Sequence, residues 1–209
     1  MALGKLITIE GLDGAGKTTL AEALVAALRS RGVDAQALRE PGGVELAERI
    51  RVLVKDPSLD VSPRAEALLY AAARAQLVEE AVKPLLADGV WVVLDRFLDS
   101  SLAYQGAGRG LGVDAVRAIN LFGTGGLVPD RTLLLRLDPA AGRARQRVRG
   151  EAPDRLEQEH DDFFATIAAA YDALAREEPA RIRPLDATRP PDEVLAAALE
   201  AIADLTAGS

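Results

Sequence analysis

One segment near the start of the chain constrains the fold more than any other. Residues 11–18 read GLDGAGKT; an apolar, β-branched run at residues 5–10 precedes them, and a stretch of helical spacing follows. The pattern G-x-x-x-x-G-K-[ST] between a strand and a helix predicts a loop whose backbone amides surround a phosphate group. Lys17 would reach the β and γ phosphates, and the Thr18 hydroxyl is placed to ligate Mg²⁺. A nucleoside triphosphate is the expected ligand, and the pattern is silent about the acceptor.

Short apolar runs alternate with longer stretches of helical periodicity along the chain. The expected strands are 5–10, 35–39, 90–95, 132–137 and 181–185, and the expected helices are 18–30, 65–87, 113–122, 163–175 and 192–205. This alternation predicts an α/β fold, with a five-stranded parallel sheet and helices on both faces. No repeat or composition break divides the sequence, so we expect one domain over residues 1–209.

Composition excludes several classes of site. The chain has no Cys and one His, His160, which excludes disulfides, thiolate metal sites, a cysteine nucleophile and a His-rich metal site. A net charge of −7 argues against a general polynucleotide binder. No apolar run approaches the roughly 20 residues of a membrane span, and the first residues do not read as a secretory signal. The expectation is a cytoplasmic protein that binds neither polynucleotide nor membrane.

The phosphate loop by itself is compatible with a GTPase switch, an ATPase that drives a larger machine, or a small-molecule kinase. The chain has only one Asn, Asn120, so an Asn-Lys-x-Asp motif that reads guanine is absent. A motor ATPase usually needs further domains or an oligomeric partner, for which this length leaves no room. A kinase needs only a second anion site that faces the first one.

Charged residues at the ends of two other expected strands indicate such a second site. Ligands of parallel sheets bind beyond the carboxyl ends of the strands. Arg39 and Glu40 follow the second expected strand, and Asp95 and Arg96 follow the third. Arginines give bidentate, permanently charged contacts to phosphate, which suits an acceptor that already carries one. A solvated surface position is the alternative for Arg39, whereas Arg96 directly follows a nearly all-apolar strand, where a solvated face is not expected.

Five segments together resemble the bacterial thymidylate kinases. They are IEGLDGAGKTT, REPGGVELAERIR, EALLYAAARAQLVEEAVKP, VLDRFLDSSLAYQGAGRGL, and RVRGEAPDRLEQE followed by DAT, and the resemblance runs from Leu6 to about Leu199. It implies the P-loop NTPase fold and an arginine-rich lid at about residues 143–157. It also implies transfer of the γ-phosphoryl group of ATP to dTMP, giving dTDP and ADP, with Mg²⁺ as cofactor. Another nucleoside monophosphate kinase, of the UMP or CMP type, and a non-catalytic nucleotide-binding regulator of the same fold stay open as alternatives.

The resemblance implies roles for individual acceptor-site residues. Tyr70 would stack on thymine, and Arg74, one helical turn later, would donate to a thymine carbonyl. Tyr104 would lie against the 2′ position of the sugar and exclude a ribose hydroxyl. From the residues alone, Tyr70 also fits an aromatic residue of the core, and Ser100 and Ser101 also fit the N-cap of a helix. The residues expected to bind dTMP are Asp13, Arg39, Glu40, Pro41, Tyr70, Arg74, Arg96, Ser100, Ser101, Tyr104 and Gln105.

Catalysis is expected to need arginines from the lid, because the phosphate loop contains none. Arg149 and Arg155 are expected on the phosphates and Arg145 or Arg147 against adenine, with a solvated helix end as the alternative. The expected catalytic residues are Lys17, Arg96, Arg149, Arg155 and Asp13, the last of which resembles a carboxylate that contacts the acceptor's 3′-hydroxyl. The residues expected to bind ATP are Gly11, Asp13, Gly14, Ala15, Gly16, Lys17, Thr18, Thr19, Arg145, Arg147 and Ala187. Thr18 and Asp95 are the expected metal residues, although Asp95 and Glu40 equally fit a role in orienting arginines.

The sequence also departs from the family at several positions. The departures are Val44, Ala73, Leu77, Phe97 and a lid that is one residue longer around Ala152-Pro153. None removes a group that the chemistry requires. The expected helix 65–87 is apolar on more than one face, and the family is homodimeric through such helices. We therefore expect a homodimer through this helix.

Overall fold

Five parallel strands form the centre of the protein. The structure is a computed structural model that describes residues 3–149 and 154–206. The strands are β1 (Leu6–Gly11), β2 (Ala35–Arg39), β3 (Trp91–Asp95), β4 (Arg131–Arg136) and β5 (Ile182–Asp186), in the order β2-β3-β1-β4-β5. Each neighbouring pair is parallel. The expected α/β fold is confirmed, and each expected strand is correct to within one residue at both ends.

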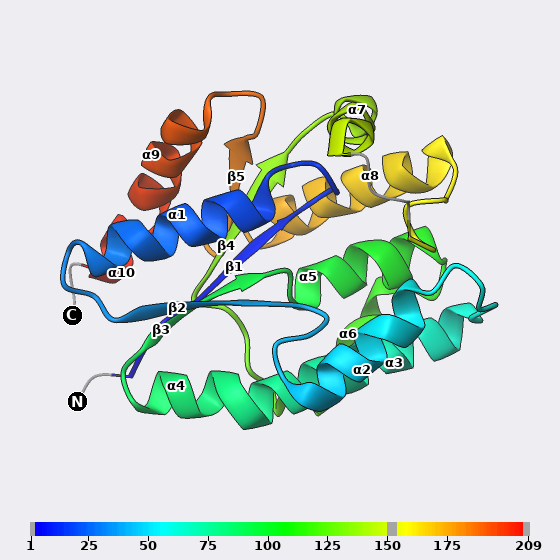
Figure 1. Ribbon diagram of the computed structural model, residues 1–209, viewed down its shortest axis with the longest axis horizontal. Helices are drawn as coiled ribbons and strands as arrows, with labels where there is room; N and C mark the ends of the chain where they lie inside the picture. Colours follow the sequence, from blue (N-terminus) through cyan, green and yellow to red (C-terminus); the bar gives the residue numbers. More distant parts are fainter. Residues whose placement is uncertain (1–2, 150–153, 207–209) are drawn as a thin grey trace.

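Helices cover both faces of the sheet (Figure 1). They are α1 (Lys17–Arg29), α2 (Glu45–Lys55), α3 (Pro63–Leu77), α4 (Lys83–Ala87), α5 (Leu98–Ser101), α6 (Val113–Thr124), α7 (Pro139–Arg149), α8 (Asp161–Glu177), α9 (Pro191–Ala201) and α10 (Ala203–Thr206). Two π-helical segments, η1 (Val78–Val82) and η2 (Leu102–Gly108), continue α3 and α5. The expected helix 65–87 is confirmed as the continuous run α3-η1-α4, whereas the expected helix 192–205 is interrupted at Ile202.

The alternation of side chains along β1 divides the core into two layers. Successive side chains of a strand point to opposite faces of the sheet. Ile7 and Ile9 pack with residues of α1 and α9, and Leu6 packs with η1 and α8 on the other face. All six residues of β1 are buried, so a strand covered on both sides explains its nearly continuous apolar sequence. Glu10 shares the parity of Leu6 and faces the α8 side.

The sheet register brings the functional segments to one edge. Asp95 at the end of β3 lies beside Ile9 of β1 and beside Arg39 of β2. Gly11, where the phosphate loop begins, lies beside Leu135 of β4. Because parallel strands end at the same edge, the phosphate loop lies next to the segments that follow β2 and β3. This edge holds the candidate site.

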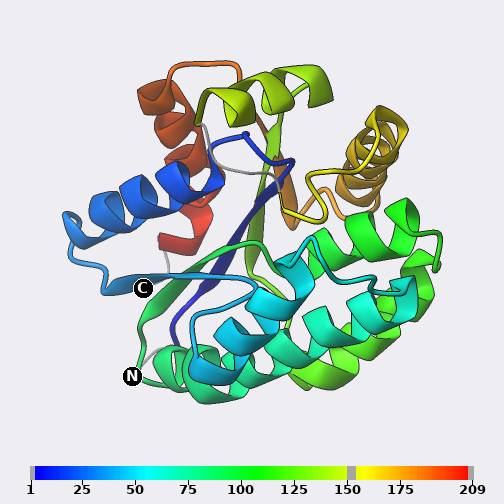
Figure 2. The ribbon, with the colours of Figure 1, turned by 45° about the vertical axis from the view of Figure 1, so that its right-hand side comes forward.

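A further layer of helices flanks the acceptor side of this edge. Figure 2 shows α2, α3 and α6 side by side, and α2 packs on α3 while α3 packs on α6. Ala47, Ile50 and Val54 of α2 form a small core with Ala73 of α3. Across the described residues, no helix has the length and apolar character needed to cross a bilayer.

Candidate active site

The phosphate loop folds as the glycine pattern predicts. Gly14 and Gly16 adopt φ angles of 80° and 95°, in the left-handed region that favours glycine. A Cβ atom on Gly14 would collide with the backbone of Gly142 in α7, so close packing also requires glycine at position 14. Gly16 is the N-cap of α1 and has no side-chain cap. The first turn of α1 therefore presents free backbone amides toward the loop, as an anion site requires.

Lys17 and Thr18 lie at the start of α1 with oxygen atoms close by. The Lys17 ammonium is 7% exposed, donates to the carbonyl of Leu12 at 2.9 Å and lies 3.7 Å from Asp13 Oδ1. Burial and then the Arg96 charge lower the pKa of Lys17 to about 8. The Thr18 hydroxyl donates to Asp95 Oδ2 at 2.6 Å. Hydroxyl and carboxylate oxygens suit Mg²⁺, which usually completes its coordination with nucleotide phosphates and waters.

No protein-only metal cage accompanies this oxygen pair. Within residues 3–149 and 154–206, no three His, Cys, Asp or Glu side chains gather in a way that could hold a metal ion. The chemistry of Thr18 and Asp95 fits a magnesium ion shared with a bound nucleotide, and does not fit a resident metal centre.

Arg96 forms the centre of a charged cluster next to the loop. Its guanidinium donates to Asp13 Oδ1 at 2.5 Å and to Ser100 Oγ at 2.9 Å, and it lies over the Tyr104 ring, 5.1 Å from the centroid. The Tyr104 hydroxyl donates to Asp13 Oδ2 at 3.1 Å. Burial opposes ionisation of Asp13, but Arg96 and Lys17 outweigh it and hold the pKa of Asp13 well below its usual range. Four expected site residues, from the phosphate loop, the segment after β3, α5 and η2, therefore lie in one cluster.

The Arg74 side chain is buried, with 2% exposed, and its guanidinium donates to several protein groups. It donates to Glu40 at 2.7 Å, to Ser101 Oγ at 2.9 Å, to the Phe97 carbonyl at 2.9 Å and to Asn120. A second nitrogen forms an ion pair with the same Glu40 oxygen at 2.6 Å, in addition to these four hydrogen bonds. Burial raises the pKa of Glu40. Its other oxygen, Oε1, is buried and has no hydrogen-bond partner among the described residues.

The face of α3 that carries Tyr70 also carries a buried carboxylate one turn earlier. Glu66 is fully buried, accepts a hydrogen bond from Gln105 at 2.9 Å and pairs with Arg109 at 3.1 Å. Arg155 of the lid segment lies 2.7 Å from the same carboxylate. One carboxylate of α3 thus contacts both an expected acceptor-site residue and an expected lid arginine.

The cleft collects most of the expected site residues. Its lining includes Asp13, Gly14, Gly16, Lys17, Thr18, Arg39, Glu40, Pro41, Tyr70, Arg74, Asp95, Arg96, Ser100, Ser101, Tyr104 and Gln105. Arg39 lies at its exposed rim, where it donates to Glu48 at 3.1 Å. The lining does not include Gly11, Ala15, Thr19, Arg145, Arg147, Arg155 or Ala187. The residues expected for the acceptor therefore converge more completely than those expected for adenine.

The lid arginines lie in different places. Arg145 donates to the carbonyl of Ala187 at 3.1 Å, so the two residues expected near adenine are in contact. The Arg155 side chain donates to the Val54 carbonyl at 3.1 Å at the end of α2 and pairs with Glu66, and its backbone N–H donates to the Lys55 carbonyl at 3.3 Å. The phosphate loop is not among the contacts of Arg155. The side chain of Arg149 and residues 150–153, which include Ala152 and Pro153, lie outside the described part of the chain.

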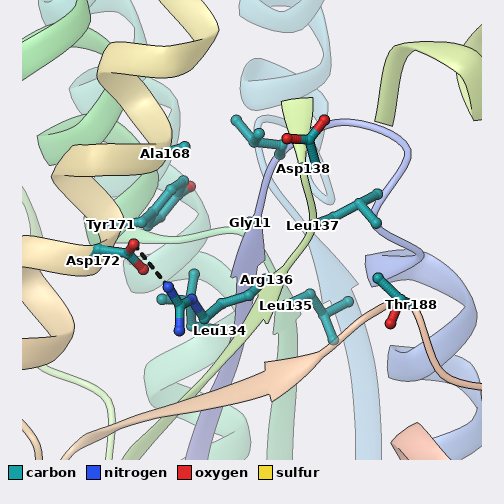
Figure 3. A pocket seen from close by; sticks show the side chains of 11 residues that line it. Gly11, Leu134, Leu135, Arg136, Leu137, Asp138, Ala168, Tyr171, Asp172 and Thr188 are labelled. Carbon is teal, nitrogen blue, oxygen red and sulfur yellow. Dashed lines mark hydrogen bonds and ion pairs between the residues drawn. The ribbon is translucent and has the colours of Figure 1, made fainter. Parts of the chain in front are cut away.

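A second cavity lies behind the phosphate loop (Figure 3). Leu134, Leu135, Leu137, Ala168 and Tyr171 supply its apolar wall. Arg136 and Asp172 form a 2.9 Å ion pair across it. Among the expected site residues, only Gly11 lines it.

Several residues of the cleft were missed by sequence reasoning. Arg51 and Lys55 line it from α2, a helix that the periodicity analysis did not predict. Gln146 and Glu157 line it from the lid segment and share a 2.8 Å hydrogen bond. Asn120 was used only to exclude guanine recognition, yet it contacts Arg74. The available signal for Asn120 was its helical spacing from the apolar Val116 in α6, and amphipathic spacing was the signal for α2.

Comparison with known proteins points to one family. Residues 9–198 match the family model described as thymidylate kinase. A protein named thymidylate kinase from Rhizorhabdus wittichii is 48% identical over 97% of this chain and 98% of its own length. Proteins of the same name from Deinococcus radiodurans and Oenococcus oeni are 48% and 46% identical, over 98% and 99% of their own lengths. The similarity spans the phosphate loop, the acceptor side of the cleft and the lid segment.

Arg74 offers a test of the buried charge network. Arg74→Met should lower the free energy of unfolding by about 3–5 kcal/mol, because it leaves the Glu40 carboxylate buried without its partner. Urea denaturation would measure the change. Arg49→Met is the matched control, since Arg49 is 75% exposed and pairs only with Glu45 on the same helix; a change within about 0.5 kcal/mol is expected there. A loss below about 1 kcal/mol for Arg74→Met would contradict this reading of the network.

Proposed function

The chain belongs to the thymidylate kinase family, and we propose that its cleft transfers the γ-phosphoryl group of ATP to dTMP, giving dTDP and ADP. The observation that carries the proposal is the cluster of Asp13, Arg96 and Tyr104 beside the phosphate loop. A partly buried, permanently charged guanidinium next to a triphosphate loop suits an acceptor that brings its own phosphate. That phosphate oxygen is already a nucleophile, so no covalent intermediate on the enzyme is needed. We also propose that the protein is located in the cytoplasm, with its two nucleotide substrates.

On the donor side, the loop amides and Lys17 neutralise the β and γ phosphates of ATP. Thr18 and Asp95 would hold Mg²⁺, which supplies further neutralisation of phosphate charge. Because phosphoryl transfer is catalysed mainly by positioning and electrostatic stabilisation, the task of these residues is to fix the γ phosphate in line with the acceptor. The buried Lys17 ammonium and its short reach to the loop support this role.

On the acceptor side, Arg96 receives the phosphate of dTMP and Asp13 contacts the 3′-hydroxyl. Asp13 stays ionised, which lets it accept from a hydroxyl and hold Arg96 at the same time. Arg39, which is exposed and contacts Glu48, completes the phosphate site from the rim. Tyr70 stacks on thymine, and Arg74 holds Ser101 and Glu40 around the base. Arg74, which has five N–H groups and donates four hydrogen bonds to protein acceptors, also donates to a thymine carbonyl.

The lid, residues 143–157 of a single kinase domain, closes over the phosphates. Arg145 or Arg147 contacts adenine, and Arg149 and Arg155 contact the phosphates. The ion pair of Arg155 with Glu66 supports a lid that closes by exchanging one anionic partner for another. Closure excludes water and so limits hydrolysis of ATP.

Dimerisation is proposed through the outer face of the helix 65–87 and its neighbours. Leu68 of α3, Leu53 of α2 and Phe122 of α6 are 57%, 47% and 89% exposed. Three large apolar side chains on adjacent helices favour burial against a second copy. Sedimentation equilibrium should give twice the chain mass at micromolar concentration. Phe122→Asp should shift the equilibrium toward the monomer, and a monomeric wild-type protein would contradict the proposal.

A panel of monophosphates tests the function directly. Coupled assays with ATP should give the highest kcat/KM for dTMP, above UMP, CMP and ribothymidine monophosphate. Removing the buried Tyr104 ring by Tyr104→Ala should raise the kcat/KM of ribothymidine monophosphate relative to that of dTMP, because space opens beside the 2′ carbon. Preference for a ribonucleotide by the wild-type protein would favour a UMP or CMP kinase, and ATP binding without turnover would favour a regulator.

Lys17 tests the phosphate loop. Lys17→Ala should reduce kcat by roughly 100-fold or more, because the charge that stabilises the transferred phosphoryl group is lost. Circular dichroism should show an unchanged fold. Lys5→Ala is the matched control, since Lys5 pairs with Asp130 at the opposite edge of the sheet. Equal turnover of wild type and Lys17→Ala would refute the loop's assignment.

A further inference from the structure

Glu10 is a fully buried carboxyl group that the proposed chemistry does not use. It lies in β1, one residue before the phosphate loop, and faces the α8 side of the sheet. The motif IEG contains it, yet neither a nucleotide nor a metal role was expected for it. A charged group at 0% exposure costs free energy unless it is well paired, so its contacts deserve a physical account.

Four donors converge on this carboxylate. Oε1 accepts from the backbone N–H of Phe97 at 2.8 Å and from that of Ser100 at 3.2 Å. Oε2 accepts from the Ser100 hydroxyl at 2.5 Å and from the Tyr171 hydroxyl at 2.9 Å. Burial and then the charge of Asp99 raise the pKa of Glu10 to about 7, while the donors and Arg96 favour its ionised form. At pH 8 the group is therefore mainly a carboxylate with both oxygens satisfied.

The same donors belong to the segment that aims Arg96. The Ser100 hydroxyl has one proton, and donating it to Glu10 leaves the oxygen to accept from Arg96 Nη1 at 2.9 Å. Arg96 itself has φ 71°, a conformation that is unfavourable for a residue with a Cβ. Glu10 accepts a hydrogen bond from the backbone N–H of Phe97, the residue after Arg96, and so fixes this turn against β1. Strained residues persist where their surroundings over-determine them.

We propose that Glu10 is a positioning residue that acts through Ser100 and the Phe97 amide to hold the Arg96 guanidinium toward the phosphate of the acceptor. The inference rests on the proposed function and adds a residue to it. Glu10 therefore contributes to the binding free energy of the acceptor's phosphate and not to that of its thymine or sugar.

The test compares two ligands that differ only in that phosphate. Dissociation constants of dTMP and thymidine would be measured by calorimetry at pH 8 for the wild type and for Glu10→Gln. The amide keeps the shape of the side chain but replaces one acceptor by a donor, so the Ser100 hydroxyl can no longer donate to that atom. We expect binding of dTMP to weaken about tenfold and binding of thymidine to stay within about twofold. Equal weakening of both ligands, or no change for either, would overturn the proposal.

Two further variants separate positioning from general stability. Asp99→Asn changes a neighbouring buried carboxylate that pairs with Arg181 at 2.7 Å and not with Arg96; it should lower Tm and leave the ratio of the two dissociation constants within about twofold. Tyr171→Phe removes one donor from Glu10 and preserves the ring, so it serves if Glu10→Gln does not fold. It should weaken dTMP about threefold and thymidine not at all, and an unchanged ratio in Tyr171→Phe would then overturn the proposal.

The outcome for the wild type distinguishes this inference from the function on which it rests. If the wild-type protein binds dTMP no better than thymidine, the assignment of Arg96 to the acceptor phosphate fails, and the proposed function with it. If the wild type prefers dTMP and Glu10→Gln keeps the whole preference, only the role of Glu10 fails.

Discussion

The ion pair between Asp13 and Arg96 is the interaction on which the rest of the site depends. It joins the phosphate loop after β1 to the segment after β3, with 2.5 Å between donor and acceptor. Those two strands are neighbours in the sheet, so the pair joins the side of the cleft that holds the phosphate loop to the side that follows β3. Arg96 also carries an unfavourable backbone conformation, which the surrounding contacts maintain. In the proposed function, this positive charge lies between two anionic nucleotides, where it would bring their reacting ends together and lower their repulsion.

The buried ion pairs around this centre fix the arrangement of the surrounding segments more than they stabilise the fold. Arg74 with Glu40, and Glu66 with Arg109 and Arg155, lie at low exposure, where desolvation costs about as much as pairing returns. Their value lies in directional contacts: each guanidinium fixes several acceptors from different helices at once. Arg74 holds segments from β2, α5 and α6 in one arrangement. Glu66, in contrast, shares its charge with the lid segment, so the one part expected to move is held by an exchangeable partner.

Much of the fold followed from the sequence, because its main signals are local. Short apolar runs that alternate with helical stretches predicted all five strands to within one residue, and the glycine pattern predicted the phosphate loop. The helix α2 was not predicted, although it contributes Arg51 and Lys55 to the cleft. The π-helical form of η2 was not predicted either, and it presents Tyr104 and Gln105 to the cleft. Periodicity analysis assumes regular spacing, and these segments are short or irregular.

The sequence by itself determined the strands, the anion loop and the chemical types that meet at the sheet edge, since each depends on neighbouring residues or on the parallel order of strands. The family also followed from the sequence, through the order and spacing of its motifs. Only the tertiary structure decided which polar groups meet. It places Arg74 in hydrogen bonds with Glu40, Ser101 and Asn120, and Arg155 in an ion pair with Glu66. The physical reason is that partners such as Glu10 and Tyr171 are 161 residues apart in the chain. Their contact depends on how the helices pack across the sheet, and no local pattern encodes that packing.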